Sequence, residues 1–258
     1  MSGVHDKALV DPAAKLADDV EVGAFSIIGP LVTIGPGSRI GSHAVVTGRT
    51  TIGKNTRIFQ FTSIGEEPQD KKYGGEDTEL IIGDNNTIRE LCTFSRGTIQ
   101  GGGKTVIGNN NWIMACVHIA HDCQLGDNII MANNASLAGH VTVGDWAILS
   151  GYSLIHQYCN VGEHSFTSFA SHVNQSIPPY VTVAGEKARA KGVNTEGLKR
   201  RGYTPEQVQQ VRRAYKLLYR SGLPLEEARE QLNEMAEGHD EIKPWIEFLD
   251  TTVKSFIR

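Results

Sequence analysis

Two histidines and a carboxylate stand close together in the middle of this 258-residue chain. His118 and His121 are three positions apart, and Asp122 follows directly. An imidazole titrates near neutral pH, so it can move a proton, hold a metal ion or simply form a hydrogen bond. Polar residues of related kinds recur at spaced positions further along the chain, namely His140, His156 and Gln157.

Three interpretations of these residues compete. As surface or interface histidines they would carry no chemistry, which is the default for any one of them taken alone. His118 and His121, together with a histidine from a neighbouring chain, could instead build a three-histidine zinc site. In the third interpretation one imidazole, oriented by Asp122 or by a backbone carbonyl, is a general base that deprotonates a hydroxyl for acyl transfer. Spacing alone favours none of the three.

The chain around these residues is an internal repeat with a period of six. One run of aliphatic residues extends from Val10 to Ile64 and a second from Ile107 to Val161, and glycine follows many of their members. A period of six turns a position by about 240° per step around an α-helix, so no apolar stripe forms, whereas an even period keeps every member on one strand face. Hexapeptide repeats of this kind predict a mainly β structure, a parallel β-solenoid.

Two segments interrupt the repeat, and a different pattern follows it. Residues 66–79 and the glycine-rich residues 95–105 are candidate functional loops because a solenoid places its insertions on one face, although the second is equally well explained as a tolerated loop. Beyond Pro179, Thr204 to Gln207 form a capping box with proline at the first helical position. We expect helices over roughly 204–222, 224–237 and 240–256. The predicted domains are therefore a β-helix over 1–186 and an α-helical C-terminal domain over 187–258.

Composition narrows the function classes. A net charge of −4 is too small to indicate a nucleic-acid partner. No apolar run is long enough to cross a bilayer and no charged-then-apolar leader is present, so we expect a cytoplasmic protein without stable membrane insertion. Three of the four cysteines, Cys92, Cys123 and Cys159, fall at the small inward corner position of the repeat, where a packed thiol is expected in place of a disulfide.

Several motifs in combination carry a family resemblance. They are Ile119-Ala120-His121-Asp122-Cys123, Ala132-Asn133-Asn134, Leu137-Ala138-Gly139-His140, His156-Gln157, Pro179-Tyr180-Val181, Gly192-Val193-Asn194 and Glu196-Gly197-Leu198-Lys199-Arg200-Arg201-Gly202. Over essentially its whole length the sequence resembles the UDP-N-acetylglucosamine O-acyltransferase family, which catalyses the first step of lipid A synthesis. A hexapeptide repeat alone would indicate only the fold.

The resemblance implies a geometry that the period does not determine. It implies a left-handed β-helix with three hexads, or eighteen residues, in each coil, and a homotrimer with its active site in the groove between adjacent prisms. Residues eighteen apart would then stack about 4.8 Å from one another on successive coils. The expected columns are His121, Gly139 and Gln157, and beside them Asp122, His140 and Tyr158.

The resemblance also implies a reaction. A 3-hydroxyacyl group would move from acyl carrier protein to the sugar 3-hydroxyl of UDP-N-acetylglucosamine, with no cofactor, metal or covalent enzyme intermediate. His121 would be the general base, Asp122 the residue that orients it, and the Gly139 N–H the donor to the oxyanion. The other matched positions would bind substrate: His118, His140, His156 and Gln157 the sugar and acyl chain, Asp70 and Lys72 the same site from the first insertion, and Asn194, Glu196, Arg200 and Arg201 the nucleotide.

Three positions depart from the family pattern. Ser95 stands where the family commonly has histidine, and Lys187 replaces a histidine often found near the nucleotide. Phe169 occupies a position that is small in relatives taking long acyl chains and larger in those taking shorter ones. The resemblance therefore implies a shortened acyl site and a medium or short 3-hydroxyacyl chain.

Three other functions also fit parts of the sequence. An amino-sugar acceptor, which would give an amide in place of an ester, also fits the sequence. A γ-type carbonic anhydrase would require zinc, and a non-catalytic scaffold would bind a nucleotide sugar without turnover. Basic residues of the first long predicted helix could dock an acidic carrier protein: Arg212, Arg213, Lys216 and Arg220.

Overall fold

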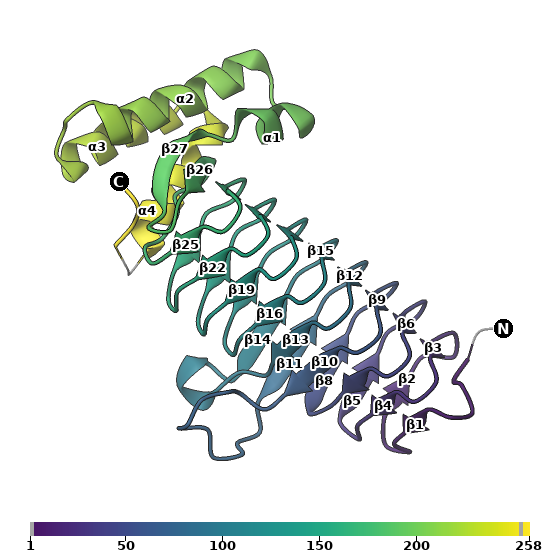
Figure 1. The fold of residues 1–258 in the computed structure, drawn as a ribbon. Coiled ribbons are helices and arrows are strands. Elements are labelled where there is room, and N and C mark those ends of the chain that lie inside the picture. Colours follow the sequence, from purple (N-terminus) through teal and green to yellow (C-terminus); the bar gives the residue numbers. More distant parts are fainter. Residues whose placement is uncertain (1–2, 253–254) are drawn as a thin grey trace.

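The computed structural model describes residues 3–252 and 255–258, which form a long prism with helices at its C-terminal end (Figure 1). Three sheets make its sides. The first contains β1 (Leu9–Val10), β4 (Ile27–Ile28), β7 (Val45–Val46), β10 (Ser63–Glu66), β13 (Thr93–Ser95), β16 (His118–Ile119), β19 (Ser136–Leu137), β22 (Leu154–Ile155) and β25 (His172–Val173). The second contains β2 (Lys15–Leu16), β5 (Val32–Ile34), β8 (Arg49–Ile52), β11 (Glu79–Ile82), β14 (Lys104–Ile107), β17 (Gln124–Leu125), β20 (Thr142–Val143) and β23 (Asn160–Val161). The third contains β3 (Glu21–Val22), β6 (Arg39–Ile40), β9 (Arg57–Ile58), β12 (Thr87–Ile88), β15 (Trp112–Ile113), β18 (Ile130–Met131), β21 (Ile148–Leu149), β24 (Phe166–Thr167), β26 (Val181–Ala184) and β27 (Arg189–Val193).

The register of the strands shows the length of one coil. Val10 pairs in parallel with Ile28, and Ile28 pairs with Val46, so an uninterrupted coil takes eighteen residues. The predicted three hexads per coil are therefore confirmed. The repeat aliphatics point inward: Ile64 and Ile113, for example, have no exposed surface. Burying this continuous apolar column holds the coils together.

The corners of the prism use a backbone conformation that is uncommon outside glycine. Many corner residues are left-handed, with φ of 62° at Asp122, 61° at His140 and 63° at Tyr158. A left-handed non-glycine residue typically costs about 1–2 kcal/mol, which the hydrogen bonds and stacking of successive coils offset. The direction of each corner side chain is consequently set by the coil, and stacked corners present their side chains in columns.

Both insertions lie at the same corner, between the first and second sheets. Residues 66–79 connect β10 to β11, and residues 95–105 connect β13 to β14. They lengthen their coils while the inward residues stay paired, Ile64 with Phe94 and Phe94 with Ile119, and the register shifts only beyond Ile64, where Glu66 pairs with Ser95. The insertions protrude together from one side of the prism (Figure 1). The next three coils carry His121, His140 and His156 at this corner.

The C-terminal part closes the prism. β26 continues the third sheet, and β27 pairs with it antiparallel before the first helix starts. The helical elements are α1 (Thr195–Arg200), α2 (Pro205–Arg220), α3 (Leu225–Ala236), the 3-10 turn Asp240–Ile242 and α4 (Lys243–Thr251). The capping box is present, since Thr204 Oγ1 accepts from Gln207 N and Gln207 Oε1 accepts from Thr204 N.

The helical region differs from the prediction in two places. α1 was not predicted, because its six residues carry no apolar period; Asn194 Oδ1 caps it by accepting from Gly197 N at 3.2 Å. The helix predicted over 240–256 ends at Thr251, and residues 253–254 of that span lie outside the described residues. The chain end is extended because Ser255 O accepts from Ser176 N and Ile257 N donates to Ser176 O, which ties it to the prism.

Candidate active site

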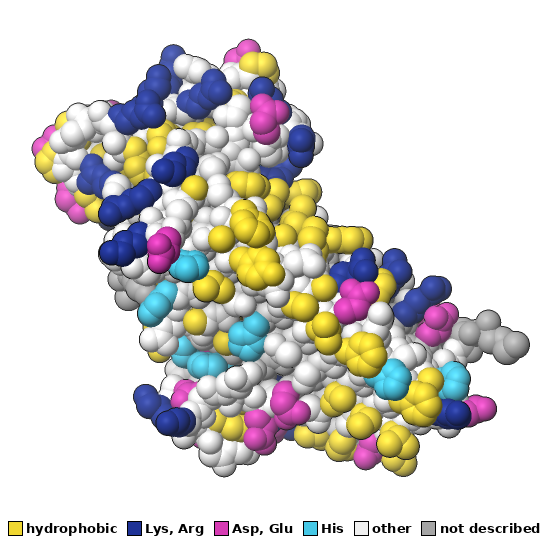
Figure 2. All heavy atoms as spheres, viewed as in Figure 1, with side chains coloured by type: hydrophobic (Ala, Val, Ile, Leu, Met, Phe, Trp, Pro, Cys, Tyr) yellow, Lys and Arg dark blue, Asp and Glu magenta, His cyan; other side chains and the backbone are white. Residues whose placement is uncertain are grey.

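The predicted stacking columns are present at the corner between the first and second sheets. His140 N donates to His121 O at 3.0 Å, and Tyr158 N donates to Gly139 O at 3.2 Å. The rings of His121 and His140 meet edge to face with centroids 5.1 Å apart, and His140 stacks on Tyr158 at 4.4 Å. In Figure 2 several histidines lie on the face between the C-terminal helices and the protruding insertions.

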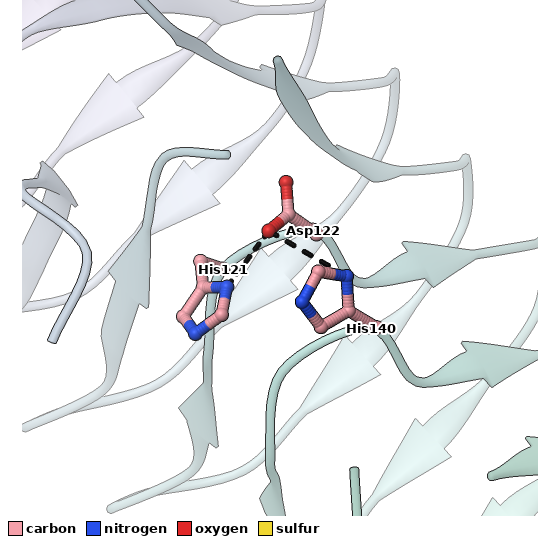
Figure 3. Close-up of side chains that lie close together, drawn as sticks. All are labelled: His121, Asp122 and His140. Atoms are coloured by element: carbon pink, nitrogen blue, oxygen red, sulfur yellow. Dashed lines mark hydrogen bonds and ion pairs between the residues drawn. The ribbon is translucent and has the colours of Figure 1, made fainter. Parts of the chain in front are cut away.

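A short hydrogen bond joins the two central residues. His121 Nδ1 lies 2.7 Å from Asp122 Oδ2, and His140 Nδ1 lies 3.7 Å from the same oxygen, so both rings point toward one carboxylate (Figure 3). A carboxylate only accepts hydrogen bonds, which assigns the ring proton of His121 to Nδ1. The lone pair is therefore on Nε2, on the far side of the ring. An imidazole held in this way can receive a proton at Nε2.

The Asp122 carboxylate is completely buried, although its residue lies at a corner of the prism. The glycine-rich insertion covers it. Thr98 donates twice, from N to Oδ1 and from Oγ1 to Oδ2, each at 2.7 Å, and Asp122 N donates to Thr105 Oγ1 at 2.8 Å. A Cβ on Gly101 would lie 2.0 Å from Asp122 Cγ, so only glycine allows this approach.

Thr98 and Thr105 are site residues that the sequence did not indicate. The sequence feature nearest to them is the run Gly101-Gly102-Gly103. From the sequence this glycine-rich segment is equally well explained as a functional loop and as a tolerated one. The contacts with Asp122 give this loop a definite structural task. Thr98 lies 24 positions and Thr105 17 positions before Asp122. No spacing pattern in the sequence links either threonine to this carboxylate, so the contact is visible only in the fold.

The two neighbouring histidines are held in the neutral form. Burial lowers the pKa of His118, whose Nδ1 lies 2.7 Å from Thr93 Oγ1. Burial also lowers the pKa of His140, and this effect exceeds the opposing influence of the Asp122 and Asp70 carboxylates. Neutral neighbours add no positive charge that would oppose proton uptake by His121.

A groove of about 420 Å³ opens beside His121 and is bordered by Gln69, His118, Gly139 and Leu154. Gly139 lies directly under the His121 ring, because a Cβ there would come within 2.6 Å of Cε1. The absence of a side chain at Gly139 therefore makes room for the His121 ring. Among the hydrogen bonds of the described residues none involves the Gly139 N–H, which leaves this donor available to a ligand in the groove.

The first insertion reaches the same corner. Gln69 borders the groove, and the charge of the adjacent Asp70 is one of the two that oppose the lowering of the His140 pKa by burial. Lys72 N donates to Asp70 Oδ1 at 3.0 Å, which closes the turn, and Lys72 is exposed. His156 and Gln157 lie one coil beyond His140 and are exposed.

The predicted nucleotide residues lie elsewhere. Asn194, Glu196, Arg200 and Arg201 border a second groove of about 580 Å³, formed between α1 and strands β18, β21 and β24 of the third sheet. None of the residues bordering it also borders the groove beside His121. Within the described part of one chain, then, the structure assembles a candidate base and a candidate nucleotide site on different sides of the prism.

The three departures from the family pattern have distinct settings. Ser95 is buried beside Arg96, whose guanidinium donates to Gly65 O at 2.7 Å and to Tyr73 Oη at 3.0 Å and so ties the two insertions together. Lys187 is exposed in the turn between β26 and β27. Phe169 lies at the corner between the third and first sheets, 69% exposed, with its ring edge against Tyr152.

His121, Asp122 and His140 also have ligand atoms that lie close enough together to hold a metal ion. Two ligands of one tetrahedral zinc ion at 2.0–2.1 Å are about 3.3 Å apart. The 2.7 Å separation of His121 Nδ1 from Asp122 Oδ2 is instead that of a charge-assisted hydrogen bond. The geometry therefore favours a proton-transfer pair over a metal centre.

Comparisons with known proteins define first a class and then a family. Two segments, residues 13–48 and 104–139, match the model for bacterial transferase hexapeptide repeats, and residues 177–257 match the second domain of UDP N-acetylglucosamine O-acyltransferase. The chain is 54% identical, over 262 residues and the full length of both proteins, to the acyl-[acyl-carrier-protein]--UDP-N-acetylglucosamine O-acyltransferase of Herminiimonas arsenicoxydans.

Solved structures agree with this assignment. The UDP-N-acetylglucosamine acyltransferase of Francisella novicida is 43% identical with a TM-score of 0.97, over 99% of this chain and 94% of that one. The corresponding Acinetobacter baumannii structure is 45% identical with a TM-score of 0.96, over 99% of both chains. This chain belongs to the UDP-N-acetylglucosamine O-acyltransferase family and is an acyltransferase. The predicted fold class, a left-handed parallel β-helix followed by a small helical region, is confirmed.

None of the helices in the described residues has the length and apolar character needed to span a bilayer.

Thr98→Val tests whether the second insertion stabilises the buried carboxylate. Removing the hydroxyl leaves Asp122 Oδ2 without one of its donors, so we expect a loss of about 1–3 kcal/mol, measured as a lower thermal denaturation midpoint. Thr98→Ser is the matched control, because it keeps the hydroxyl and removes only a methyl group. Equal midpoints for Thr98→Val and Thr98→Ser would show that the hydrogen bond contributes nothing.

Proposed function

We propose that this protein transfers a 3-hydroxyacyl group from acyl carrier protein to the 3-hydroxyl of UDP-N-acetylglucosamine, the first step of lipid A synthesis. The acyl donor and the acceptor are those given in the names of its relatives. The observation that supports the chemistry is the His121–Asp122 pair, with its carboxylate buried and its Nε2 directed away from that carboxylate. A general base for a hydroxyl needs this arrangement.

The proposed mechanism uses this chain's own groups at each step. His121 Nε2 takes the proton of the sugar 3-hydroxyl as that oxygen attacks the thioester carbonyl. The Gly139 N–H donates to the oxyanion of the tetrahedral intermediate. Collapse of the intermediate forms the ester and breaks the carbon–sulfur bond, and the departing thiolate takes the proton back from His121. The enzyme is thereby returned to its starting state without a covalent intermediate.

Asp122 matters most when His121 is protonated. The imidazolium then faces a carboxylate that water does not screen, so their attraction is stronger than at a surface. Thr98 and Thr105 hold Asp122 in place, which prevents it from rotating away from Nδ1. His118 and His140, both neutral because burial lowers their pKa, are suited to hydrogen-bond sugar hydroxyls or the acyl 3-hydroxyl.

A homotrimer would complete the site. The groove beside His121 is open on one side, and the groove of Arg200 and Arg201 lies on the third sheet of the same chain. Cyclic symmetry can bring the third-sheet groove of one subunit against the histidine corner of its neighbour. The sugar would then reach His121 of one subunit while its diphosphate binds Arg200 and Arg201 of the next, through planar guanidinium donors.

The experiment that tests the reaction is a single assay. The protein is incubated with UDP-N-acetylglucosamine and a series of 3-hydroxyacyl carrier proteins, and the product is analysed by mass and by alkaline hydrolysis. An alkali-labile monoacyl product supports the proposal. An alkali-stable acyl product, formed only with an amino-sugar nucleotide, would replace it with the N-acyltransferase alternative.

His121→Ala should lower the transfer rate by about 10²- to 10⁴-fold, the usual contribution of a general base, without changing the binding of UDP. The rate is measured under saturating substrates, and UDP binding by calorimetry. His239→Ala, which changes a histidine among the C-terminal helices, is the control and should behave as the parent. Activity within a few-fold of the parent for His121→Ala would contradict the assignment of the base.

Mixed trimers test the shared site. His121→Ala and Arg201→Ala chains are each expected to be poorly active below the parental KM for the nucleotide sugar. When the two chains are co-expressed in equal amounts, mixed trimers should contain interfaces in which an intact His121 meets an intact Arg201. Random mixing in a cyclic trimer puts such an interface at about one quarter of the sites. Recovery to that level supports the trimer, and no recovery would place both residues in the site of a single chain.

Phe169 is the proposed limit on acyl-chain length. Its ring is exposed and supported by Tyr152, and it lies outside the core of the prism. In the trimer it would stand in the path of a long chain, and overpacking of about 1–3 kcal/mol corresponds to roughly a ten- to hundredfold preference for medium or short donors. Phe169→Gly should shift the preference to longer chains in competition assays, whereas an unchanged ranking would remove Phe169 from this role.

A further inference from the structure

His164 occupies a corner between the second and third sheets and is not among the residues assigned to the site. Its side chain is only 9% exposed. The ring lies in a stack, parallel to Trp146 at 6.3 Å on one side and to Tyr180 at 5.5 Å on the other. The edge of Tyr203 covers it from the helical region at 5.3 Å. These contacts hold the imidazole in one orientation.

The ring nitrogens of His164 face different partners. Nδ1 lies 3.0 Å from the Arg201 guanidinium, and Nε2 lies 3.3 Å from Tyr203 Oη. Arginine can only donate, so Nδ1 must be the unprotonated acceptor and the ring hydrogen must be on Nε2. Burial and the charge of Arg201 lower the pKa of His164 to about 4, which keeps it neutral and able to accept.

Arg201 is fixed from two directions. One terminal nitrogen donates to His164 Nδ1, and the other donates to Trp146 O at 2.7 Å, while the guanidinium lies 5.3 Å from the centre of the Trp146 ring. Both acceptors are uncharged, so Arg201 keeps a full positive charge and still has further N–H donors beside its groove. Arg200, on the same groove, is exposed.

We propose that His164 is a positioning residue that holds the Arg201 guanidinium ready for the diphosphate of the nucleotide sugar. This inference rests on the proposed function, which puts the diphosphate at Arg201. An arginine ordered before binding loses less conformational freedom on contact with the ligand. A carboxylate in place of His164 would neutralise the arginine, and a purely apolar ring would leave it with Trp146 O as its remaining acceptor. A neutral imidazole avoids both effects.

The test compares two substitutions at His164, each to a residue that can adopt the backbone conformation of this position. His164 has φ of 56°. Asparagine suits this conformation, and its Oδ1 can replace Nδ1 as the acceptor. Phenylalanine keeps the stacked ring but accepts no hydrogen bond, and Phe25 and Phe61 show that other corners of this prism hold phenylalanine at φ of 62°. His164→Leu is a second variant without an acceptor, for use if His164→Phe does not fold.

UDP is the probe for binding, and steady-state kinetics follow both substrates. His164→Phe should raise the Kd for UDP and the KM for UDP-N-acetylglucosamine by about three- to tenfold, with kcat and the KM for the acyl donor unchanged. His164→Asn should restore values near those of the parent. In an Arg201→Ala background, His164→Phe should have no additional effect on UDP binding, because the two residues act as one unit.

Three results would overturn the inference: a parental Kd in His164→Phe, an equal loss in His164→Phe and His164→Asn, or a loss that persists in the Arg201→Ala background. The last two would indicate a purely structural role. The proposed function fails separately, when the parent protein neither binds UDP nor transfers an acyl group. If the parent has normal activity and His164→Phe binds UDP with the parental Kd, only the role of His164 is contradicted.

Discussion

The parallel register of the stacked coils is the constraint on which this structure depends. Each coil donates backbone hydrogen bonds to the next and buries one aliphatic residue per side, so a shift of a strand by one position would turn its apolar side chain outward. Ile64 pairs with Phe94 and Phe94 with Ile119 despite the insertions between them. The inward residues keep their register because the additional residues leave the prism at a corner, and the one irregularity between these strands lies beyond Ile64, where Glu66 pairs with Ser95.

This constraint determines where chemistry can arise. Corner residues stack on one another, so the first insertion, the glycine-rich insertion, His121 and His140 follow each other along one edge. The glycine-rich loop lies on the coil before Asp122 and folds over its carboxylate. A buried carboxylate is costly unless donors satisfy it. The two bonds donated by Thr98 and the one donated by His121 meet this requirement and orient the pair at the same time.

The groove beside His121 and the groove of Arg201 differ in the charge that the structure holds there. Beside His121 an anion is buried next to rings kept neutral by burial, an arrangement that would stabilise a positive charge on His121. Around Arg201 a permanent positive charge is held by neutral acceptors, His164 and a backbone carbonyl, so that it is not cancelled before a ligand binds. The first arrangement suits a proton transfer, and the second suits an anionic ligand.

The sequence by itself determined the solenoid, its helical end and the family. A period of six with inward aliphatics admits few folds, and the capping box at Thr204 marks a helix start from local chemistry alone. These signals are local or periodic, which is why they can be read without a structure. The resemblance also placed His121, Asp122 and Gly139 together, and the columns predicted from eighteen residues per coil are those observed.

Only the tertiary structure decided what surrounds those residues. Thr98 and Thr105 meet Asp122 across a loop whose length no period predicts, and Gly139 proved to make room for the His121 ring. The contact of His164 with Arg201 joins a corner of the prism to a short helix that had no sequence signal. Such contacts depend on how separate segments pack. Hydrogen bonds between side chains far apart in the sequence follow no fixed spacing, so a single sequence does not reveal them.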